Sequence, residues 1–135
     1  MFLPDSKTDG LYINLPLKLN TAFLNNSLAA IGTNVIDPVA EGGILADYVV
    51  TAAYDASAVA QEARCLPITD DMRFVADCDA DTNVNQILKL CKIGAGNTLD
   101  NDGAASTTTG FLIEKILGTR KVAGRFVRKI NVEVN

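Results

Sequence analysis

Hydrophobic and polar residues alternate most regularly near the end of the chain. Over residues 122–134 most even positions are apolar, whereas most odd positions are charged or polar. Because successive side chains of a strand point to opposite faces, this period of two predicts a strand with one buried and one exposed face. Together with the apolar run that begins at Phe111, it predicts a long β-hairpin over residues 111–134 that turns at Gly118-Thr119.

A second alternating stretch lies near the start of the chain. Its apolar residues occupy every second position and are Leu11, Ile13, Leu15, Leu17 and Leu19. Pro16 has no backbone N–H and cannot donate to a sheet ladder, so the stretch predicts either an edge strand or an extended arm on a neighbouring subunit. We therefore divide the chain into an N-terminal arm or edge strand, residues 1–20, and a single β-rich domain, residues 21–135.

The middle of the chain shows weaker patterns. Residues 71–81 alternate and predict a third strand, and residues 44–54 contain a further strand-like run. Residues 21–31 carry an apolar stripe that predicts a short helix. The alanine-rich residues 52–63 fit either a helix or a bend between two strands.

The stretch before the final hairpin contains a short apolar segment and a long polar one. Residues 84–93 predict a buried strand, or a short helix that leads to one. Residues 94–110 are rich in Gly, Ala, Asn, Asp, Ser and Thr and predict a long loop, functional or mobile. The fold class expected from these patterns is all-β or β-rich: a single-domain antiparallel β-barrel or β-sandwich with an extended N-terminal arm and at most one or two short helices.

The amino-acid composition limits the classes of function that we expect for this protein. At 135 residues the chain is long enough to bury a core without metals or disulfides, but aromatic residues make up only 6% and His is absent. The commonest general base and metal ligand is therefore missing, and we expect no enzyme activity and no cofactor. The three cysteines, spaced thirteen apart, match neither a disulfide framework nor a zinc site. With no recognisable signal peptide or membrane span, these features predict folding in a reducing cytosol.

Charge is divided unevenly along the chain. Residues 1–110 hold 6 basic and 14 acidic groups, whereas residues 111–135 hold 6 basic and 2 acidic groups. The two parts either neutralise each other within one fold or leave a basic strand face for an acidic partner, such as another copy of the chain. The basic candidates are Arg120, Lys121, Arg125 and Lys129. Nucleic acid is not an expected partner, because the chain is acidic overall and lacks a basic patch with stacking aromatics.

The acidic residues Asp77, Asp79 and Asp81 alternate as the oxygen ligands of a calcium loop do. Such a loop needs Gly at its sixth position and Glu at its twelfth, where this chain has Thr82 and Leu88. A solvated acidic strand end is therefore the favoured interpretation. Paired carboxylates could also serve glycoside hydrolysis, but the sequence does not show which of them meet in space.

Several stretches of the second half resemble small structural proteins encoded in tailed-phage head gene clusters. They comprise a polar Asp-Ala-Asp strand end, a turn-rich middle and a closing Val-x-Gly-x-Phe strand, in Met72–Asn83, Ile87–Ile93, Thr98–Gly103, Phe111–Ile113 and Lys121–Val127. The resemblance implies a capsid decoration or cement protein, a β-barrel or β-sandwich module bound in many copies to an icosahedral shell.

That resemblance implies the major capsid protein as partner, a homo-oligomeric or multi-copy lattice, and a location on the virion surface after folding in the host cytoplasm. Leu11–Leu19 would be the arm and the basic residues a second contact. A head–tail connector or tail component is the first alternative. The second is a small carbohydrate- or surface-binding module with its site in residues 94–110.

Overall fold

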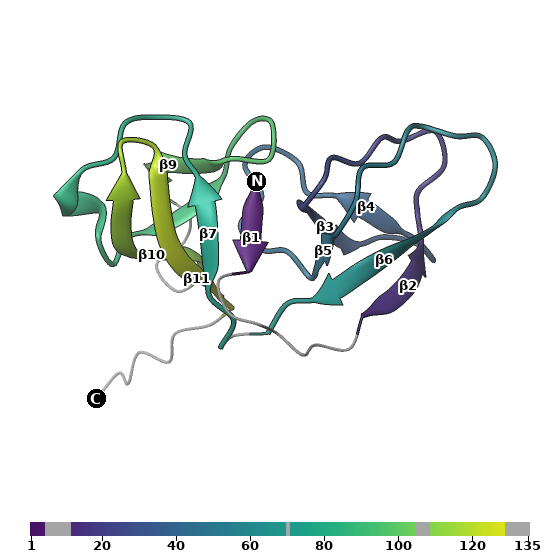
Figure 1. The fold of residues 1–135 in the computed structure, drawn as a ribbon, viewed down its shortest axis with the longest axis horizontal. Helices are drawn as coiled ribbons and strands as arrows, with labels where there is room; N and C mark the ends of the chain where they lie inside the picture. Colours follow the sequence, from purple (N-terminus) through teal and green to yellow (C-terminus); the bar gives the residue numbers. More distant parts are fainter. Residues whose placement is uncertain (5–11, 70, 105–108, 129–135) are drawn as a thin grey trace.

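The computed structural model describes residues 1–4, 12–69, 71–104 and 109–128. These residues form eleven strands and a single 3-10 turn. The strands make two antiparallel sheets that lie side by side along the long axis of the molecule (Figure 1). The predicted all-β fold class is confirmed.

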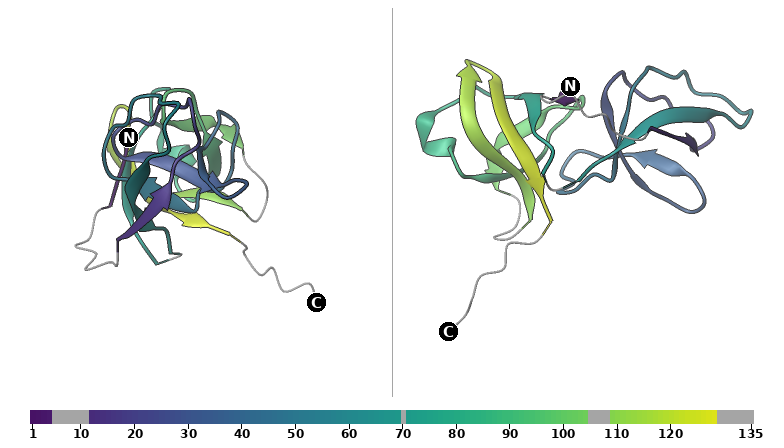
Figure 2. Two further views of the ribbon diagram at one scale, coloured as in Figure 1. Left: turned by 90° about the vertical axis from the view of Figure 1, so that its right-hand side faces the viewer. Right: turned by 60° about the horizontal axis from the view of Figure 1, so that its bottom comes forward.

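The larger sheet has six strands in the order β1-β7-β11-β10-β8-β9. It curls into a half-barrel (Figure 2), because the residue after β7, Cys78, forms a bridge to Leu99 at the start of β9. The strands, in chain order, are β1 Phe2–Pro4, β7 Phe74–Asp77, β8 Leu90–Ile93, β9 Leu99–Ala104, β10 Gly110–Gly118 and β11 Lys121–Val127.

The smaller sheet has five strands in the order β2-β6-β5-β3-β4, so β2 and β4 form its edges. The two edges approach each other at one end, where Leu17 bridges Ile36 and the Lys18 amide donates to the Ile36 carbonyl at 3.1 Å. The strands are β2 Ile13–Pro16, β3 Ser27–Ile31, β4 Ile36–Pro38, β5 Tyr48–Val50 and β6 Glu62–Pro67.

The predicted C-terminal hairpin is present as β10 and β11, which pair from Gly110 and Val127 to Gly118 and Lys121. Within β11 the even positions are buried, as the alternation predicts. β11 is a central strand, paired with β7 on its other side. The part of the prediction that covers residues 129–134 lies outside the described residues.

Four phenylalanines form the centre of the main core. The ring of Phe126 packs against those of Phe2, Phe74 and Phe111, with centroid separations of 5.7, 5.5 and 5.1 Å. All four side chains are fully buried. Buried residues of the smaller sheet, including Leu28, belong to the same cluster, so the two sheets share a core. Such aromatic pairs contribute about 1 kcal/mol each beyond their buried area.

The smaller sheet also has a second core on its other face. Neighbouring residues of one strand divide between the two clusters: Val49 packs in the main core, and Val50 in the second. Leu28 and Ala29 divide in the same way. Strands that are buried on both faces have no polar side in their sequence, which explains why β3 and β5 lack a clear period of two.

The helix predicted for residues 21–31 is wrong. Residues 27–31 form β3, and Phe23 instead makes an isolated bridge with Tyr54. Asn26 has a positive φ of 52°, which is incompatible with a continuing right-handed helix. The apolar stripe reflects a strand whose two faces are both buried. No helix occurs within residues 52–63: residues 52–61 form an irregular connection between β5 and β6, and β6 begins at Glu62.

The loop predicted for residues 94–110 is also wrong in part, because residues 99–104 form β9 and pair with β8. Residues 100–103, which lie within the predicted loop, are therefore part of a strand. Its polar residues are stabilised in the sheet by side-chain hydrogen bonds, most of all those of the fully buried Asn101. For residues 84–93, the short helix that leads to a strand is confirmed, since a 3-10 turn at Val84–Gln86 precedes β8.

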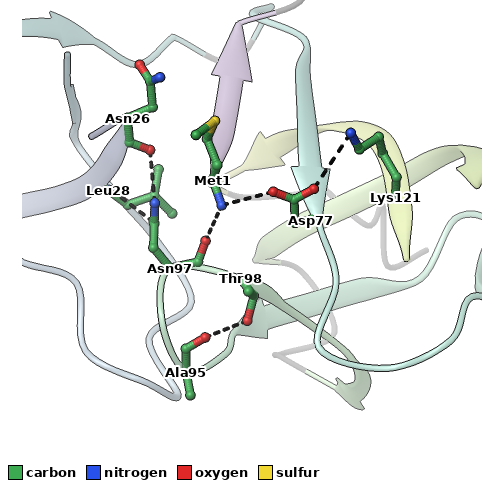
Figure 3. A network of polar contacts seen from close by, with 8 residues as sticks. All are labelled: Met1, Asn26, Leu28, Asp77, Ala95, Asn97, Thr98 and Lys121. Carbon is green, nitrogen blue, oxygen red and sulfur yellow. Dashed lines mark hydrogen bonds and ion pairs between the residues drawn. The ribbon is translucent and has the colours of Figure 1, made fainter. Parts of the chain in front are cut away.

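A polar network joins the two sheets beside β1 (Figure 3). The Asn97 side chain donates to the Asn26 carbonyl at 2.9 Å and accepts from the Leu28 amide at 3.3 Å. The Met1 amino group donates to the Asn97 carbonyl at 2.6 Å and lies 3.5 Å from Asp77 Oδ2. Asn97 thus connects the turn between β8 and β9 to the start of β3.

The three thiols are buried in the cores. Burial raises the pKa of Cys65 and Cys91 to about 11, and burial together with the neighbouring Cys91 and Asp79 raises that of Cys78 to about 12. We expect Ellman's reagent at mildly alkaline pH to label the native protein only as fast as it unfolds, and to label all three thiols at once in denaturant. Rapid labelling of one native thiol would contradict this burial.

The same pKa values predict a pH dependence of stability. Unfolded thiols ionise near their ordinary pKa of 9.0, whereas the folded thiols hold their protons to about 11–12. The thiol contribution to the free energy of unfolding is therefore complete below pH 9 and is lost as the pH rises through that window.

Candidate interaction surface

The predicted N-terminal apolar residues differ in how far they are exposed. Leu17 is buried in the second core, and Leu15 is half-buried against it. Ile13 and Leu19 are 45% and 47% exposed, so they are the members of the set that face solvent. The alternation ends because the chain leaves the sheet after Leu17 and turns at Asn20, which has a positive φ of 56°. Leu11 lies outside the described residues.

A slot with a volume of about 350 Å³ opens between the two edges of the smaller sheet. It lies beside the Leu17–Ile36 bridge, on the side of the sheet that holds the second core. Apolar side chains form most of its wall, and Ile31 is 69% exposed there. The slot is lined by Leu15, Pro16, Ile31, Gly32, Asn34, Val35, Ile36 and Tyr48.

The predicted basic residues are paired with carboxylates of the same chain. Arg120 Nε lies 2.9 Å from Asp81 Oδ1, and Lys121 Nζ lies 3.8 Å from Asp77 Oδ1. Arg125 Nε lies 3.5 Å from Glu114 Oε2. Lys129 lies outside the described residues.

These pairs are partly exposed, so each contributes about 0–1 kcal/mol to stability. The main consequence of these ion pairs is that carboxylates neutralise the positive charges of the basic side chains. The strand face carries alternating charges of both signs instead of a continuous basic stripe.

The three aspartates of the candidate calcium loop do not converge. Asp77 lies between the Met1 amino group and Lys121, and Asp81 pairs with Arg120. Asp79 is separate from these pairs: partial burial, with added repulsion from Asp100 and other carboxylates, raises its pKa. Among the described residues, no group of three or more Cys, Asp or Glu is arranged to hold a metal ion.

The two predicted contact regions lie at opposite ends of the molecule. The turn between β10 and β11, with Arg120 and Lys121, is at one end of the long axis, and β2 is at the other (Figures 1 and 2). The two sets therefore do not form one continuous surface on a single copy.

Sequence reasoning missed the residues of β3, β4 and β5 that complete the slot. Ile31 and Val35 are missed because the helix predicted for residues 21–31 hides the hairpin to which they belong. Tyr48 lies in the strand-like run of residues 44–54, but that run does not show which strand lies beside it. The signal was present: Gly32, Thr33 and Asn34 separate two short apolar runs and are typical of a β-hairpin turn. In the structure Asn34 has a positive φ of 60° in that turn.

A membrane-spanning helix would need about 20 apolar residues. In the part of the chain that the structure describes, no helix has the length and hydrophobicity that a span requires.

Comparison with known proteins gives a match at the level of the fold. No family model matches the chain, and no protein matches it in a search of curated sequences. Its structure is similar to that of the head fiber gp8.5 N base in bacteriophage phi29, with a TM-score of 0.56 and 12% sequence identity. The alignment covers 90% of this chain and 100% of that chain. The two chains share a fold.

Proposed function

We propose that this protein is a non-enzymatic structural component of a phage head, bound to the outside of the capsid. The observation that carries the proposal is the fold match to a phage head fiber base over 90% of the chain, which includes both sheets. The resemblance of residues 72–127 to phage head proteins is a separate observation that supports the same class. The expected partner is the major capsid protein, and the expected form is many copies on one shell.

A decoration or cement role is the more specific form of the proposal. A protein of this kind needs no catalytic residues, because it acts through repeated contacts with a lattice, and its overall binding is strengthened by multivalency. The fold match favours a second form, in which the domain is the capsid-bound base of a longer appendage. Both forms require direct attachment to the shell.

The exposed apolar residues at the β2 end are the candidate shell contacts. Ile13 and Leu19 face solvent, and Tyr12 is 43% exposed, with the Arg64 guanidinium 3.8 Å above its ring. Because Arg64 pairs with Asn14, Tyr12 and Arg64 lie on the face of β2 opposite to Ile13. Aromatic and arginine side chains are enriched in protein interfaces, so the β2 end carries residues suited to a contact on both of its faces. The basic residues near β11 are less suited to a shell contact, because their charges are neutralised within the chain.

The proposal is tested by co-sedimentation of the purified protein with capsids that lack it, counting copies bound per shell. We expect saturable binding at a copy number set by icosahedral symmetry. Replacing Ile13 and Leu19 with Asp should abolish co-sedimentation while leaving the circular dichroism spectrum and thermal midpoint unchanged. A matched control is Val59→Asp, which changes an apolar residue that is 73% exposed in another part of the smaller-sheet half.

A salt series separates the two candidate contacts. Binding through Ile13 and Leu19 should persist as salt rises, whereas binding through Arg120 and Lys121 should weaken. The absence of any binding by a folded protein would refute the head-surface role. Binding at the single portal vertex would instead favour a connector or tail component.

A further inference from the structure

The segment between β7 and β8 runs beside β10 at the end of the larger sheet. The Thr82 amide donates to the Thr119 carbonyl at 2.6 Å, and the Leu88 amide donates to the Ile113 carbonyl at 2.6 Å. The 3-10 turn lies between these two hydrogen bonds, at the end of the molecule away from the smaller sheet (Figure 1). The segment and the last residues of β10 therefore form one surface.

Four apolar side chains are exposed on this surface, and we call them the tip patch. Val84 is 75% exposed and Leu88 is 70% exposed, and Ile87 and Leu117 are exposed as well. Single exposed apolar residues are common on proteins, but a group of them marks an interaction site. The tip patch lies at the opposite end of the long axis from β2, so it is separate from the candidate shell contacts (Figure 1).

The backbone of Leu88 has an unfavourable conformation. Leu88 follows the 3-10 turn with a positive φ of 66°, where a bulky side chain is strained and glycine is the usual residue. Every other described residue with a positive φ is an asparagine or a glycine. Strained residues of this kind cluster at functional sites. A leucine here costs stability, and its exposed side chain gains little from burial within the chain.

A lysine of β10 lies beside the tip patch. Lys115 and Leu117 point to the same side of the strand, because Ile116 between them packs against the main core. Lys115 is exposed, and within the described part of the chain no carboxylate pairs with it, since the neighbouring Glu114 pairs with two arginines instead. Its positive charge is therefore available to a partner.

A carboxylate lies on the other side of Leu117 along β10. Asp81 pairs with Arg120 in the turn that follows β10, and its side chain is 72% exposed. The tip patch thus has a lysine on one side and a carboxylate on the other. Such a surface is complementary to itself about a two-fold axis, because each Lys115 then faces the Asp81 of the other copy.

We propose that two copies of this chain associate through the tip patch to form a two-fold symmetric dimer. The apolar side chains of the two patches cover one another, and Lys115 of each copy pairs with Asp81 of the other. The contact also accounts for Leu88, whose apolar side chain becomes buried only in the dimer. The exposed residues of β2 remain free at both ends. The dimer is independent of the proposed function, because its formation needs no capsid.

The first test is sedimentation velocity of the full chain over a concentration series, which should show a monomer in equilibrium with a dimer. Leu88→Gly should raise the dissociation constant roughly tenfold or more. The thermal midpoint of its monomer, measured at low concentration, should equal or exceed that of the parent, because glycine removes the strain. Val59→Asp, an exposed apolar position outside the tip patch, should leave the dissociation constant unchanged.

A charge exchange tests the two-fold arrangement. Lys115→Asp and Asp81→Lys should each weaken the dimer, because each places like charges opposite one another. An equal mixture of the two variants should form a mixed dimer, because every changed side chain then faces an opposite charge. A parent chain that stays monomeric at millimolar concentration would overturn the proposal. So would a mixture that associates no better than either variant alone, or a dimer that Leu88→Gly leaves intact.

Discussion

Gly124→Ala is expected to destabilise the protein by more than about 3 kcal/mol, at or beyond the upper end of the range for overpacked cores. Gly124 lies in β11, between β10 and β7. A Cβ atom at this position would overlap the Leu112 carbonyl oxygen and lie 2.8 Å from Cε1 of the Phe111 ring. The oxygen belongs to a paired strand and the ring to the phenylalanine cluster, so neither can move without disturbing the sheet or the core.

The measurement is urea denaturation of the two proteins, or soluble expression if the variant does not fold. Gly118→Ala is the matched control, because Gly118 ends β10 in the same hairpin and a Cβ there would meet only Lys121 Cβ, at an ordinary 3.9 Å. We expect that variant to stay within about 0.5 kcal/mol of the parent. Equal stability of the two variants would mean that β10 and β11 are not packed as described.

Asn101→Ala is expected to lower the free energy of unfolding by about 3 kcal/mol, because it removes one buried and two part-buried hydrogen bonds. The Asn101 side chain is fully buried. It accepts from the Ala80 amide at 3.2 Å and donates to the Asp81 carbonyl at 3.2 Å and to Gln86 Oε1 at 3.0 Å. A buried polar group that loses its partner costs about 1–3 kcal/mol, and the two part-buried backbone groups lose theirs.

The effect should be local as well as global. Gln86 also donates to Asp102 Oδ1 at 3.2 Å and caps the 3-10 turn, so loss of Asn101 should loosen the link between that turn and β9. Hydrogen exchange should then rise first in residues 80–89 and 99–102. The control is Asn85→Ala, an exposed asparagine in the same turn. A loss below about 1 kcal/mol for Asn101→Ala would show that water replaces its bonds.

The closing hairpin could be predicted from sequence because its alternating pattern has one cause, the burial of one face of the strand. β11 buries its even positions, whereas Lys121 is exposed and Ala123 and Arg125 are half-buried, so the alternation records the strand directly. The same holds for β7, where Phe74 and Ala76 face the core. The polar strand β9 could not be predicted, because the partners that stabilise Asn101 come from residues 80–86, which are distant in sequence.

The candidate contact surface was only partly predictable. The sequence alone shows that Ile13, Leu17 and Leu19 share a period of two, but Leu17 is buried and the other two are exposed. The curl of the sheet makes that choice, since it brings Leu17 onto Ile36. Likewise, the excess of basic residues near the C-terminus is visible in the sequence, whereas their pairing with Asp77, Asp81 and Glu114 depends on strand register.

The amino-acid sequence by itself determined the all-β class, the two alternating strands of the second half and the lack of histidine chemistry. These properties depend on residue type and on neighbours along the chain. The tertiary structure decided that there are two sheets with a shared core, that Gly124 must lack a side chain, and that a slot opens between β2 and β4. Those features arise from contacts between residues far apart in sequence, which no local pattern records.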